Sequence, residues 1–258
     1  MEANLLKKAQ SDKCTKKICI IIPTYNEKLN LQILIPQICT ALNSLKLEIF
    51  STVLIVDDNS PNGTGKLAEN LAQIYENVRV LHRPTKFGIG SAYRQGFSYA
   101  LQRLDSDIIF QMDADLSHDP TSIPNFLAKL EEDYDAVIGS RKVPGGAVIG
   151  WSFYRRLMSS IANKLSRWLC GIKIFDATSG YRAFTSKTLK KIEYSSVKSN
   201  GYAFQIEILF RCQREGFSIA EIPIVFTDRS LEKTKLNKME VFRFMLTCLK
   251  LFFRKYFI

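Results

Sequence analysis

The sequence lacks the signatures of several common classes of protein. Six cysteines, at positions 14, 19, 39, 170, 212 and 248, form no Cys-x-x-Cys pair, and only two histidines occur among 258 residues. These counts disfavour a zinc site and a disulfide framework, and we expect reduced, mostly buried thiols. No Gly-x-Gly-x-x-Gly occurs at the first strand-to-helix turn, and no Walker-type Gly-Lys-Ser/Thr occurs anywhere. Dinucleotide redox chemistry and nucleotide hydrolysis are therefore disfavoured as well.

Long apolar segments are also missing. Residues 1–17 contain no apolar stretch of the kind that a secretory signal requires, so we expect the active face to meet the cytosol. No uncharged run reaches the ~20 residues that span a bilayer. No Ser/His/Asp or Cys/His constellation indicates a strongly activated nucleophile.

Positive charge, in contrast, is abundant and unevenly placed. The formal net charge is +11. Residues 151–170 hold four cations and no acid, and residues 231–258 hold seven cations and two acids, so these two stretches account for +9. Both are also unusually apolar. Basic and apolar character together favours a membrane surface over nucleic acid as the partner.

Strand-like and helical patterns alternate through the first half of the chain. We predict strands near 18–23, 52–57, 78–82, 107–112 and 135–140, and helices near 29–43, 64–76, 90–103 and 121–132. Such alternation is typical of an α/β fold with a mostly parallel sheet covered on both faces.

Two further segments have the spacing of amphipathic helices. Residues 151–169 place apolar side chains at helical intervals opposite Arg and Lys, which predicts a helix at a membrane interface or one packed on the sheet. Residues 241–258 carry their polar side chains on one narrow stripe, with apolar residues elsewhere. We expect this second helix to lie in the membrane interface or against a partner's membrane helix, because its cations argue against full burial.

Three strands end in polar clusters, which predicts one shared crevice at the carboxyl edge of the sheet. Asp113 and Asp115 follow a buried strand, where two carboxylates suit a hard divalent cation and the diphosphate that it carries. Ser117 could add a hydroxyl ligand, whereas we expect His118 to be a loop residue because Mg²⁺ and Mn²⁺ prefer oxygen. Asp57 and its neighbour at 58 could bind a ribose or base, or cap the next helix.

Other residues around this edge suit a nucleotide and phosphate groups. Tyr25 could flank a base and Glu27 could accept hydrogen bonds from it. Arg141, Arg229 and Lys235 could each meet a phosphate, although a solvated surface role is the default for any single cation.

The motifs resemble family-2 glycosyltransferases of the GT-A fold, and most nearly the dolichyl-phosphate (polyprenyl-phosphate) mannosyltransferases. The matching segments run in family order over residues 18–250. They are Pro-Thr-Tyr-Asn-Glu (23–27), Val-Asp-Asp-Asn-Ser-Pro-Asn-Gly-Thr (56–64), Met-Asp-Ala-Asp-Leu-Ser-His (112–118), Gly-Ser-Arg (139–141), Gly145-Gly146, Gly150-Trp151, Gly-Tyr-x-Phe-Gln-x-Glu (201–207) and Asp228-Arg229.

The resemblance implies transfer of mannose from GDP-mannose to a dolichyl (polyprenyl) phosphate with inversion, on a Rossmann-like GT-A fold. It implies that Mg²⁺ or Mn²⁺ and the diphosphate are held by Asp113, Asp115 and Ser117. It also implies nucleotide contacts from Pro23, Tyr25, Glu27, Asp57, Asp113, Ala114 and Asp115. Arg141, Arg229 and Lys235 would complete the catalytic set by binding phosphates. The acceptor phosphate is already an anionic nucleophile, so positioning and electrostatics suffice.

The resemblance further implies a peripheral protein on the cytoplasmic face of the endoplasmic reticulum membrane, with no role for nucleic acid. The chain resembles the short form of the family that works beside small membrane-anchoring subunits. We expect an extension over 1–17, a GT-A domain over 18–230 that includes helix 151–169, and a basic helical segment over 231–258. One departure is notable: Glu232 and Thr234 stand where the family's loop usually has Gly and Ser.

Three alternatives stay open from the sequence. The first is the same chemistry with UDP-glucose as the donor. The second is a non-catalytic sugar-nucleotide-binding subunit, which the presence of Asp113 and Asp115 disfavours. The third is a nucleic-acid-binding module, which rests on charge alone, because no nucleic-acid motif is recognisable.

Overall fold

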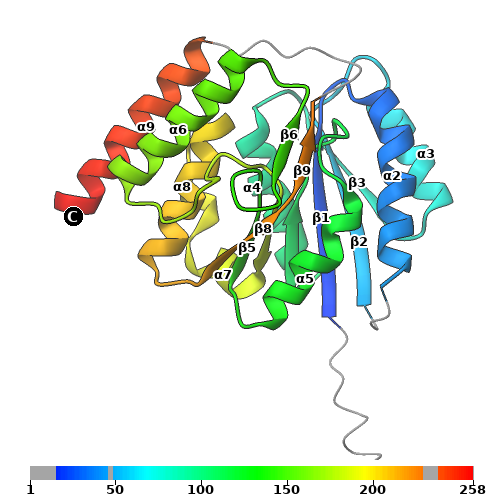
Figure 1. The fold of residues 1–258 in the computed structure, drawn as a ribbon. Coiled ribbons are helices and arrows are strands. Elements are labelled where there is room, and N and C mark those ends of the chain that lie inside the picture. Colours follow the sequence, from blue (N-terminus) through cyan, green and yellow to red (C-terminus); the bar gives the residue numbers. More distant parts are fainter. Residues whose placement is uncertain (1–15, 46–48, 229–237, 258) are drawn as a thin grey trace, which may run out of the picture.

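A seven-stranded sheet lies at the centre of the computed structural model, which describes residues 16–45, 49–228 and 238–257 (Figure 1). In pairing order its strands are β3 (Val78–His82), β2 (Ile49–Asp57), β1 (Lys16–Thr24), β4 (Ile108–Gln111), β7 (Arg182–Thr185), β5 (Ala136–Ser140) and β8 (Ile219–Pro223). All pairs are parallel except those of β7, which is antiparallel to β4 and β5. The predicted mostly parallel sheet is confirmed, and so are its five predicted strands.

Helices cover both faces of this sheet, as its strands require. β1 shows why: Ile20 and Ile22 belong to the cluster on one face, while Cys19 and Ile21 belong to the cluster on the other. A strand that is apolar on both sides needs cover on both sides. The first face is covered by α2 (Lys28–Asn43), α3 (Thr64–Ile74) and α5 (Ile123–Glu131), and the second by α4 (Ile89–Gln102) and α8 (Gly201–Arg214). The four helices predicted in the first half are present.

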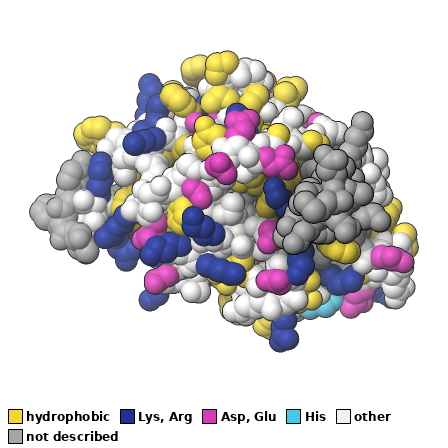
Figure 2. Space-filling view, turned by 90° about the horizontal axis from the view of Figure 1, so that it is seen from below, with side chains coloured by type: hydrophobic (Ala, Val, Ile, Leu, Met, Phe, Trp, Pro, Cys, Tyr) yellow, Lys and Arg dark blue, Asp and Glu magenta, His cyan; other side chains and the backbone are white. Residues whose placement is uncertain are grey.

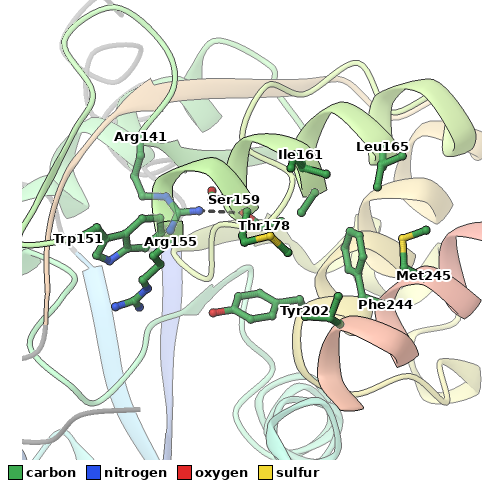
Figure 3. A pocket seen from close by; sticks show the side chains of 13 residues that line it. Arg141, Trp151, Arg155, Ser159, Ile161, Leu165, Thr178, Tyr202, Phe244 and Met245 are labelled. Atoms are coloured by element: carbon green, nitrogen blue, oxygen red, sulfur yellow. Dashed lines mark hydrogen bonds between the residues drawn. The ribbon is translucent and has the colours of Figure 1, made fainter. Parts of the chain in front are cut away.

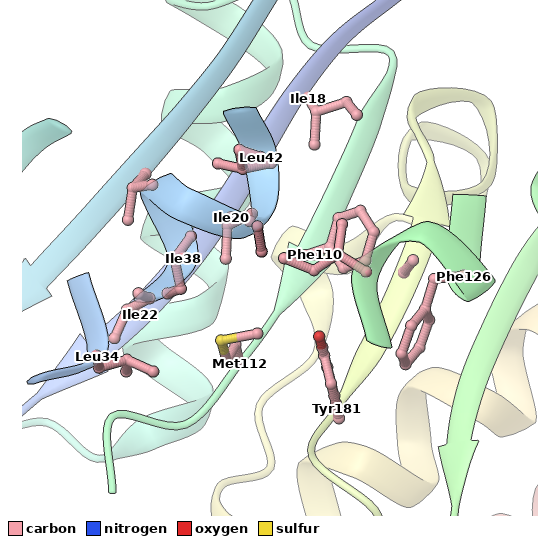
Figure 4. Close-up of a cluster of buried hydrophobic side chains, with 14 of the residues drawn as sticks. Ile18, Ile20, Ile22, Leu34, Ile38, Leu42, Phe110, Met112, Phe126 and Tyr181 are labelled. Carbon is pink, nitrogen blue, oxygen red and sulfur yellow. The ribbon is translucent and has the colours of Figure 1, made fainter. Parts of the chain in front are cut away.

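Figure 4 shows the core of the first face. Ile20 and Ile22 from β1 meet Leu34 and Ile38 from α2, and Phe110 from β4 lies beside them. These side chains are fully buried. Their packing helps to fix how far β1 and β4 extend relative to one another along the strand direction. It thereby sets the positions of the loops that follow both strands. The short elements η1 (Pro120–Ser122), α7 (Ser186–Lys191) and η2 (Tyr194–Ser196) connect the larger ones.

Two more helices lie side by side at one end of the molecule (Figure 1). They are α6 (Phe153–Cys170) and α9 (Lys238–Phe257), and both contact a third cluster that includes residues of α8. A separate two-stranded parallel ribbon, β6 (Ala147–Ile149) with β9 (Val225–Thr227), leads into these helices. The helices predicted over 151–169 and 241–258 correspond to α6 and α9.

The α6 helix is turned so that polar residues face inward. Its buried positions are Asn163, Ser166 and Cys170. Its exposed large side chains include Phe153 (81 % exposed) and Trp168 (77 % exposed). Tyr154, Leu157 and Ile161 are exposed as well. Because a helix in water normally does the opposite, this face is expected to meet an apolar environment.

The polar stripe predicted for α9 is present, and the apolar surface of this helix divides into a buried stripe and an exposed one. Phe244, Cys248 and Leu251 are buried in the third cluster. A second stripe remains exposed, formed by Phe242, Leu246, Leu249 and Phe253. A third stripe is polar, formed by Arg243, Thr247, Lys250 and Arg254. The helix is thus anchored in the core and still presents apolar side chains outward.

Positive charge accompanies this apolar surface. Lys and Arg side chains gather near the end of α9 when the molecule is viewed from below (Figure 2). Lys191, Arg214 and Arg254 line a polar cleft in this region. In the part of the chain that the structure describes, none of the helices is sufficiently long and apolar to span a membrane.

Candidate functional site

The carboxyl ends of β1, β2 and β4 meet at the point where the strand order reverses, and a polar cleft of about 390 Å³ lies there. Ligands of open α/β sheets bind at such a switch point. The cleft brings together six of the residues predicted to bind the nucleotide: Pro23, Tyr25, Glu27, Asp113, Ala114 and Asp115.

Asp57 lies behind the wall of this cleft. Its carboxylate is buried and accepts hydrogen bonds from the hydroxyl of Thr24 (3.0 Å) and from the hydroxyl (2.6 Å) and backbone N–H (3.1 Å) of Ser60. The neighbouring Asp58 lines the cleft instead. Asp57 therefore orders the turn after β2, and Asp58 is the carboxylate that a ligand would meet.

Two cations that the sequence analysis did not single out flank Asp58. Arg83 forms a buried ion pair with it, and burial raises the pKa of Asp58 although the charge of Arg83 opposes this. Lys86 lines the cleft, with its ammonium 3.8 Å from the centroid of the Tyr25 ring. These two cations bring positive charge beside a cleft whose other charged lining residues are Glu27, Asp58, Asp113 and Asp115. Both come from the segment between β3 and α4.

Asp113 is held at both its backbone and its side chain. The Tyr93 hydroxyl donates to Asp113 Oδ1 (3.2 Å), and the Asp113 N–H donates to His118 Nδ1 (3.1 Å). Tyr93 is fully buried, and burial followed by the Asp113 charge raises its pKa well above the usual value, so it stays a donor. Gly180 leaves room for this carboxylate, since a Cβ at Gly180 would lie 2.9 Å from Asp113 Oδ2.

Ser117 binds Asp115 rather than facing the cleft. Asp115 Oδ1 accepts from both the hydroxyl and the backbone N–H of Ser117, and both residues are buried. The structure thus places Ser117 where it orients Asp115. His118 stacks on Tyr181 with ring centroids 5.0 Å apart, in keeping with the loop position expected for it.

The oxygens of Asp113 and Asp115 suit a hard divalent cation. Among the described residues no set of three or more His, Cys, Asp or Glu is grouped to hold a metal. Two carboxylates therefore fit an ion that completes its shell with diphosphate oxygens and water, as Mg²⁺ commonly does.

A second cavity of about 330 Å³ lies between α6 and α9, and its walls are apolar (Figure 3). Met158, Ile161 and Leu165 line it from α6, while Phe244 and Met245 line it from α9. Its other end is polar and includes Arg141, Arg155, Ser159, Thr178 and Tyr202. We call this cavity the apolar groove.

Arg141 is placed at the polar end of the groove by a buried carboxylate. Its Nε and Nη2 donate to the two oxygens of Asp176 (2.6 and 2.7 Å), its backbone N–H donates to the same side chain, and Nη2 also donates to Thr178. Burial by itself raises the pKa of Asp176, but the charge and hydrogen bonds of Arg141 outweigh burial and lower it. The ion pair keeps both groups charged, so Arg141 offers a fixed cation to the groove.

Arg155 is a second cation at this end, which the sequence analysis counted only as part of a charged stretch. It forms an ion pair with Asp228 (2.6 Å) and lines the groove. Two buried polar atoms nearby, Ser159 Oγ and Trp151 Nε1, have no hydrogen-bond partner among the described residues. Unsatisfied buried donors next to cations indicate a place for an anion. Arg229 and Lys235, predicted to bind phosphate, lie outside the described residues.

Comparison with known proteins agrees with this arrangement. The sequence model of glycosyl transferase family 2 matches residues 19–193. A polyprenol monophosphomannose synthase from Mycolicibacterium smegmatis is 42 % identical over 86 % of this chain and 82 % of its own length. An undecaprenyl-phosphate mannosyltransferase from Micrococcus luteus is 40 % identical over 86 % and 88 %, respectively.

Solved structures share the fold. Glucosyl-3-phosphoglycerate synthase from Mycobacterium tuberculosis, solved with Mn²⁺, UDP-glucose and phosphoglyceric acid, has a TM-score of 0.66 at 17 % identity and covers 95 % of this chain and 83 % of its own. A mannosyltransferase from Pyrobaculum calidifontis, solved with GDP-Man and Mn²⁺, has a TM-score of 0.57 at 17 % identity and covers 86 % and 59 %.

Proposed function

This chain belongs to glycosyl transferase family 2, and from that premise we propose that it transfers mannose from GDP-mannose to the phosphate of a polyprenyl (dolichyl) phosphate. The two curated relatives are a polyprenol monophosphomannose synthase and an undecaprenyl-phosphate mannosyltransferase, and the match extends over most of all three chains. The product would be a polyprenyl phosphate mannose that serves as a membrane-bound sugar donor.

The observation that carries the proposal is the apolar groove with two guanidinium groups at one end. A polyprenyl phosphate is a long apolar chain with one anionic head. The groove offers apolar walls from α6 and α9 for the chain, and Arg141 and Arg155 for the head. A water-soluble acceptor would have no use for such walls.

The polar cleft supplies the donor side of the reaction. Tyr25 offers an aromatic face for a base, and Glu27 and Asp58 offer carboxylates that accept from its N–H groups. Mg²⁺ or Mn²⁺ held by Asp113 and Asp115 would neutralise the charge that develops on the departing diphosphate. This assignment is supported by the oxygen ligands that the two residues present.

The residues of the chain then have to orient two phosphates. An oxygen of the acceptor phosphate attacks the anomeric carbon of mannose, the bond from that carbon to the diphosphate breaks, and the configuration inverts. Arg141 and Arg155 hold the attacking phosphate, and its negative charge makes a strong general base unnecessary. We assign Arg229 and Lys235 to the same task on the basis of their sequence motif.

The exposed apolar stripes of α6 and α9 support a location on a membrane surface. Both helices line the apolar groove, and Arg243, Lys250 and Arg254 on the polar stripe of α9 favour anionic lipid. We assign the enzyme to the membrane that holds the acceptor, which is the endoplasmic reticulum membrane in cells with this organelle. The reaction would take place on the cytoplasmic face of that membrane. Small membrane-anchoring subunits would bind the same stripes.

The first experiment compares donors and acceptors in one assay. Purified protein is incubated with Mn²⁺, a short polyprenyl phosphate and radiolabelled GDP-mannose or UDP-glucose, and label is counted in the organic phase. Label from GDP-mannose alone, and none when the corresponding prenol replaces the phosphate, is the expected result. Label from UDP-glucose alone would overturn the donor. GDP binding without any transfer would indicate a missing subunit or a non-catalytic role.

A further inference from the structure

Trp151 occupies a position at the polar end of the apolar groove that the reaction described so far does not use. Its indole is 9 % exposed and lies with Arg141 and Arg155 in Figure 3. The guanidinium carbon of Arg141 is 5.0 Å from the ring centroid, and that of Arg155 is 4.4 Å away. One indole therefore contacts both cations proposed to bind the acceptor phosphate.

Like charges at this end of the groove need an arrangement that offsets their repulsion. Each guanidinium has a carboxylate of its own, Asp176 for Arg141 and Asp228 for Arg155. These ion pairs tie the two cations to different segments of the chain, and neither pair relates one cation to the other. The indole of Trp151 positions the two cations relative to one another. Its negative π face attracts both guanidinium groups, and the ring belongs to a single residue.

The backbone around Trp151 is built for this contact. Gly150 has φ +87°, and a Cβ there would lie 2.9 Å from the Cβ of Asp228. Only glycine accommodates this conformation and this approach without strain. The Asp228 N–H also donates to the carbonyl of Ile149 (3.0 Å). The end of β6 thus brings Trp151 and the partner of Arg155 together.

Trp151 is also linked to the donor side. Its ring meets Phe226 edge-on at 5.3 Å, and Phe226 meets His118 edge-on at 5.8 Å. His118 accepts from the backbone of Asp113. Packed rings thus connect the acidic residues of the cleft to the cations of the groove, and their rigidity would fix the distance between the two phosphates.

The described contacts leave donors for a ligand. The hydrogen bonds of Arg141 use Nε and Nη2, and the ion pair of Arg155 uses Nη1. Trp151 Nε1 is buried without a partner among the described residues. An unused buried N–H in contact with two cations is placed to add a neutral donor to the same anion.

We propose that Trp151 is a positioning residue for the acceptor: it holds Arg141 and Arg155 towards one phosphate monoester. This inference rests on the proposed function for the identity of the acceptor. It predicts that Trp151 acts on the acceptor and leaves donor binding unaffected.

The kinetic test uses two variants with farnesyl phosphate as a short acceptor. Trp151→Leu removes the π face, and loss of two cation–π contacts is expected to raise the KM for farnesyl phosphate about 5- to 30-fold. Trp151→Phe keeps a ring and removes the N–H, so a smaller rise, about threefold, is expected. The KM for GDP-mannose should stay within about twofold in both. Equal rises in both KM values, or an unchanged acceptor KM in Trp151→Leu, would overturn the inference.

A spectroscopic test does not depend on turnover. The chain has two tryptophans, so Trp168→Phe leaves Trp151 as its sole indole fluorophore. Farnesyl phosphate should change the Trp151 emission saturably, whereas farnesol at the same concentration should not. Identical responses to both compounds, or none, would contradict the assignment even if Trp151→Leu failed to fold. If the unmodified protein transferred no mannose, this titration would still decide whether Trp151 senses a phosphate, so failure of the inference stays distinguishable from failure of the proposed function.

Discussion

The exposed aromatic side chains of α6 predict a measurable loss of membrane binding when they are removed. Phe153 is 81 % exposed and Trp168 is 77 % exposed, so Phe153→Ser with Trp168→Ser changes little inside the fold. Full burial of a large apolar side chain is worth about 1.5–3 kcal/mol. Scaled by the exposed fractions, the pair contributes about 2–5 kcal/mol if both rings enter the bilayer. The partition coefficient onto vesicles should fall at least about 30-fold.

A matched control uses apolar side chains of similar exposure elsewhere on the surface. Phe50 on β2 is 71 % exposed and Ile74 on α3 is 69 % exposed. Both elements lie towards the edge of the sheet that is far from α6 and α9 (Figure 1). Sedimentation with vesicles that contain anionic lipid gives the partition coefficient of each double variant. If Phe50→Ser with Ile74→Ser weakened binding as much as the α6 pair, general surface hydrophobicity would explain the binding and our orientation would be refuted.

Three other variants test the site and its support. Asp115→Ala should abolish transfer while circular dichroism shows an intact fold, and normal metal-dependent turnover would refute the metal assignment. Tyr93→Phe removes the hydrogen bond to Asp113, worth about 1 kcal/mol, so the Mn²⁺ dissociation constant measured by electron paramagnetic resonance with GDP present should rise about fivefold; an unchanged constant would exclude this role. Asp176→Asn leaves Arg141 buried without its counterion, so urea unfolding at pH 7 should show a loss of about 3–5 kcal/mol. Because the folded pKa of Asp176 is lowered, its stabilisation is present above the unfolded pKa of about 3.9 and is lost as the pH falls through the lower folded value. The difference between the variant and the parent should therefore shrink in strong acid, and a constant difference down to pH 2 would argue against this ion pair.

Much of the polar cleft could be predicted from the sequence because strand ends are local signals. Apolar runs followed at once by polar clusters mark the carboxyl ends of β1, β2 and β4, and parallel strands bring these ends to one edge. The same logic could not separate Asp57 from Asp58, since adjacent residues in a turn point in different directions. It also could not find Tyr93, whose contact with Asp113 depends on how α4 packs.

The apolar groove was less predictable because it is made from distant segments. Arg141 follows a strand and was predicted to meet a phosphate, but its counterion Asp176 lies 35 residues further along the chain. The α8 helix was not predicted, because its buried positions include Gln205 and Glu207 and it shows no clear polar face. The spacing of residues 151–169 did predict the α6 helix, while its place at a membrane interface, suggested by aromatic residues and cations without acids, stays a prediction.

The position of the apolar groove has a consequence for how the rate should be described. If the helices that flank the groove face the bilayer, as we propose, the enzyme would meet its acceptor by diffusion within a two-dimensional phase, and the acceptor's tail would not have to leave the lipid. The relevant variable is then the mole fraction of polyprenyl phosphate among the lipids, and adding inert phospholipid at constant total acceptor should slow the enzyme. The rate would depend on the water-soluble donor through its bulk molar concentration. The two substrates would therefore need different concentration scales, one in solution and one in the membrane plane.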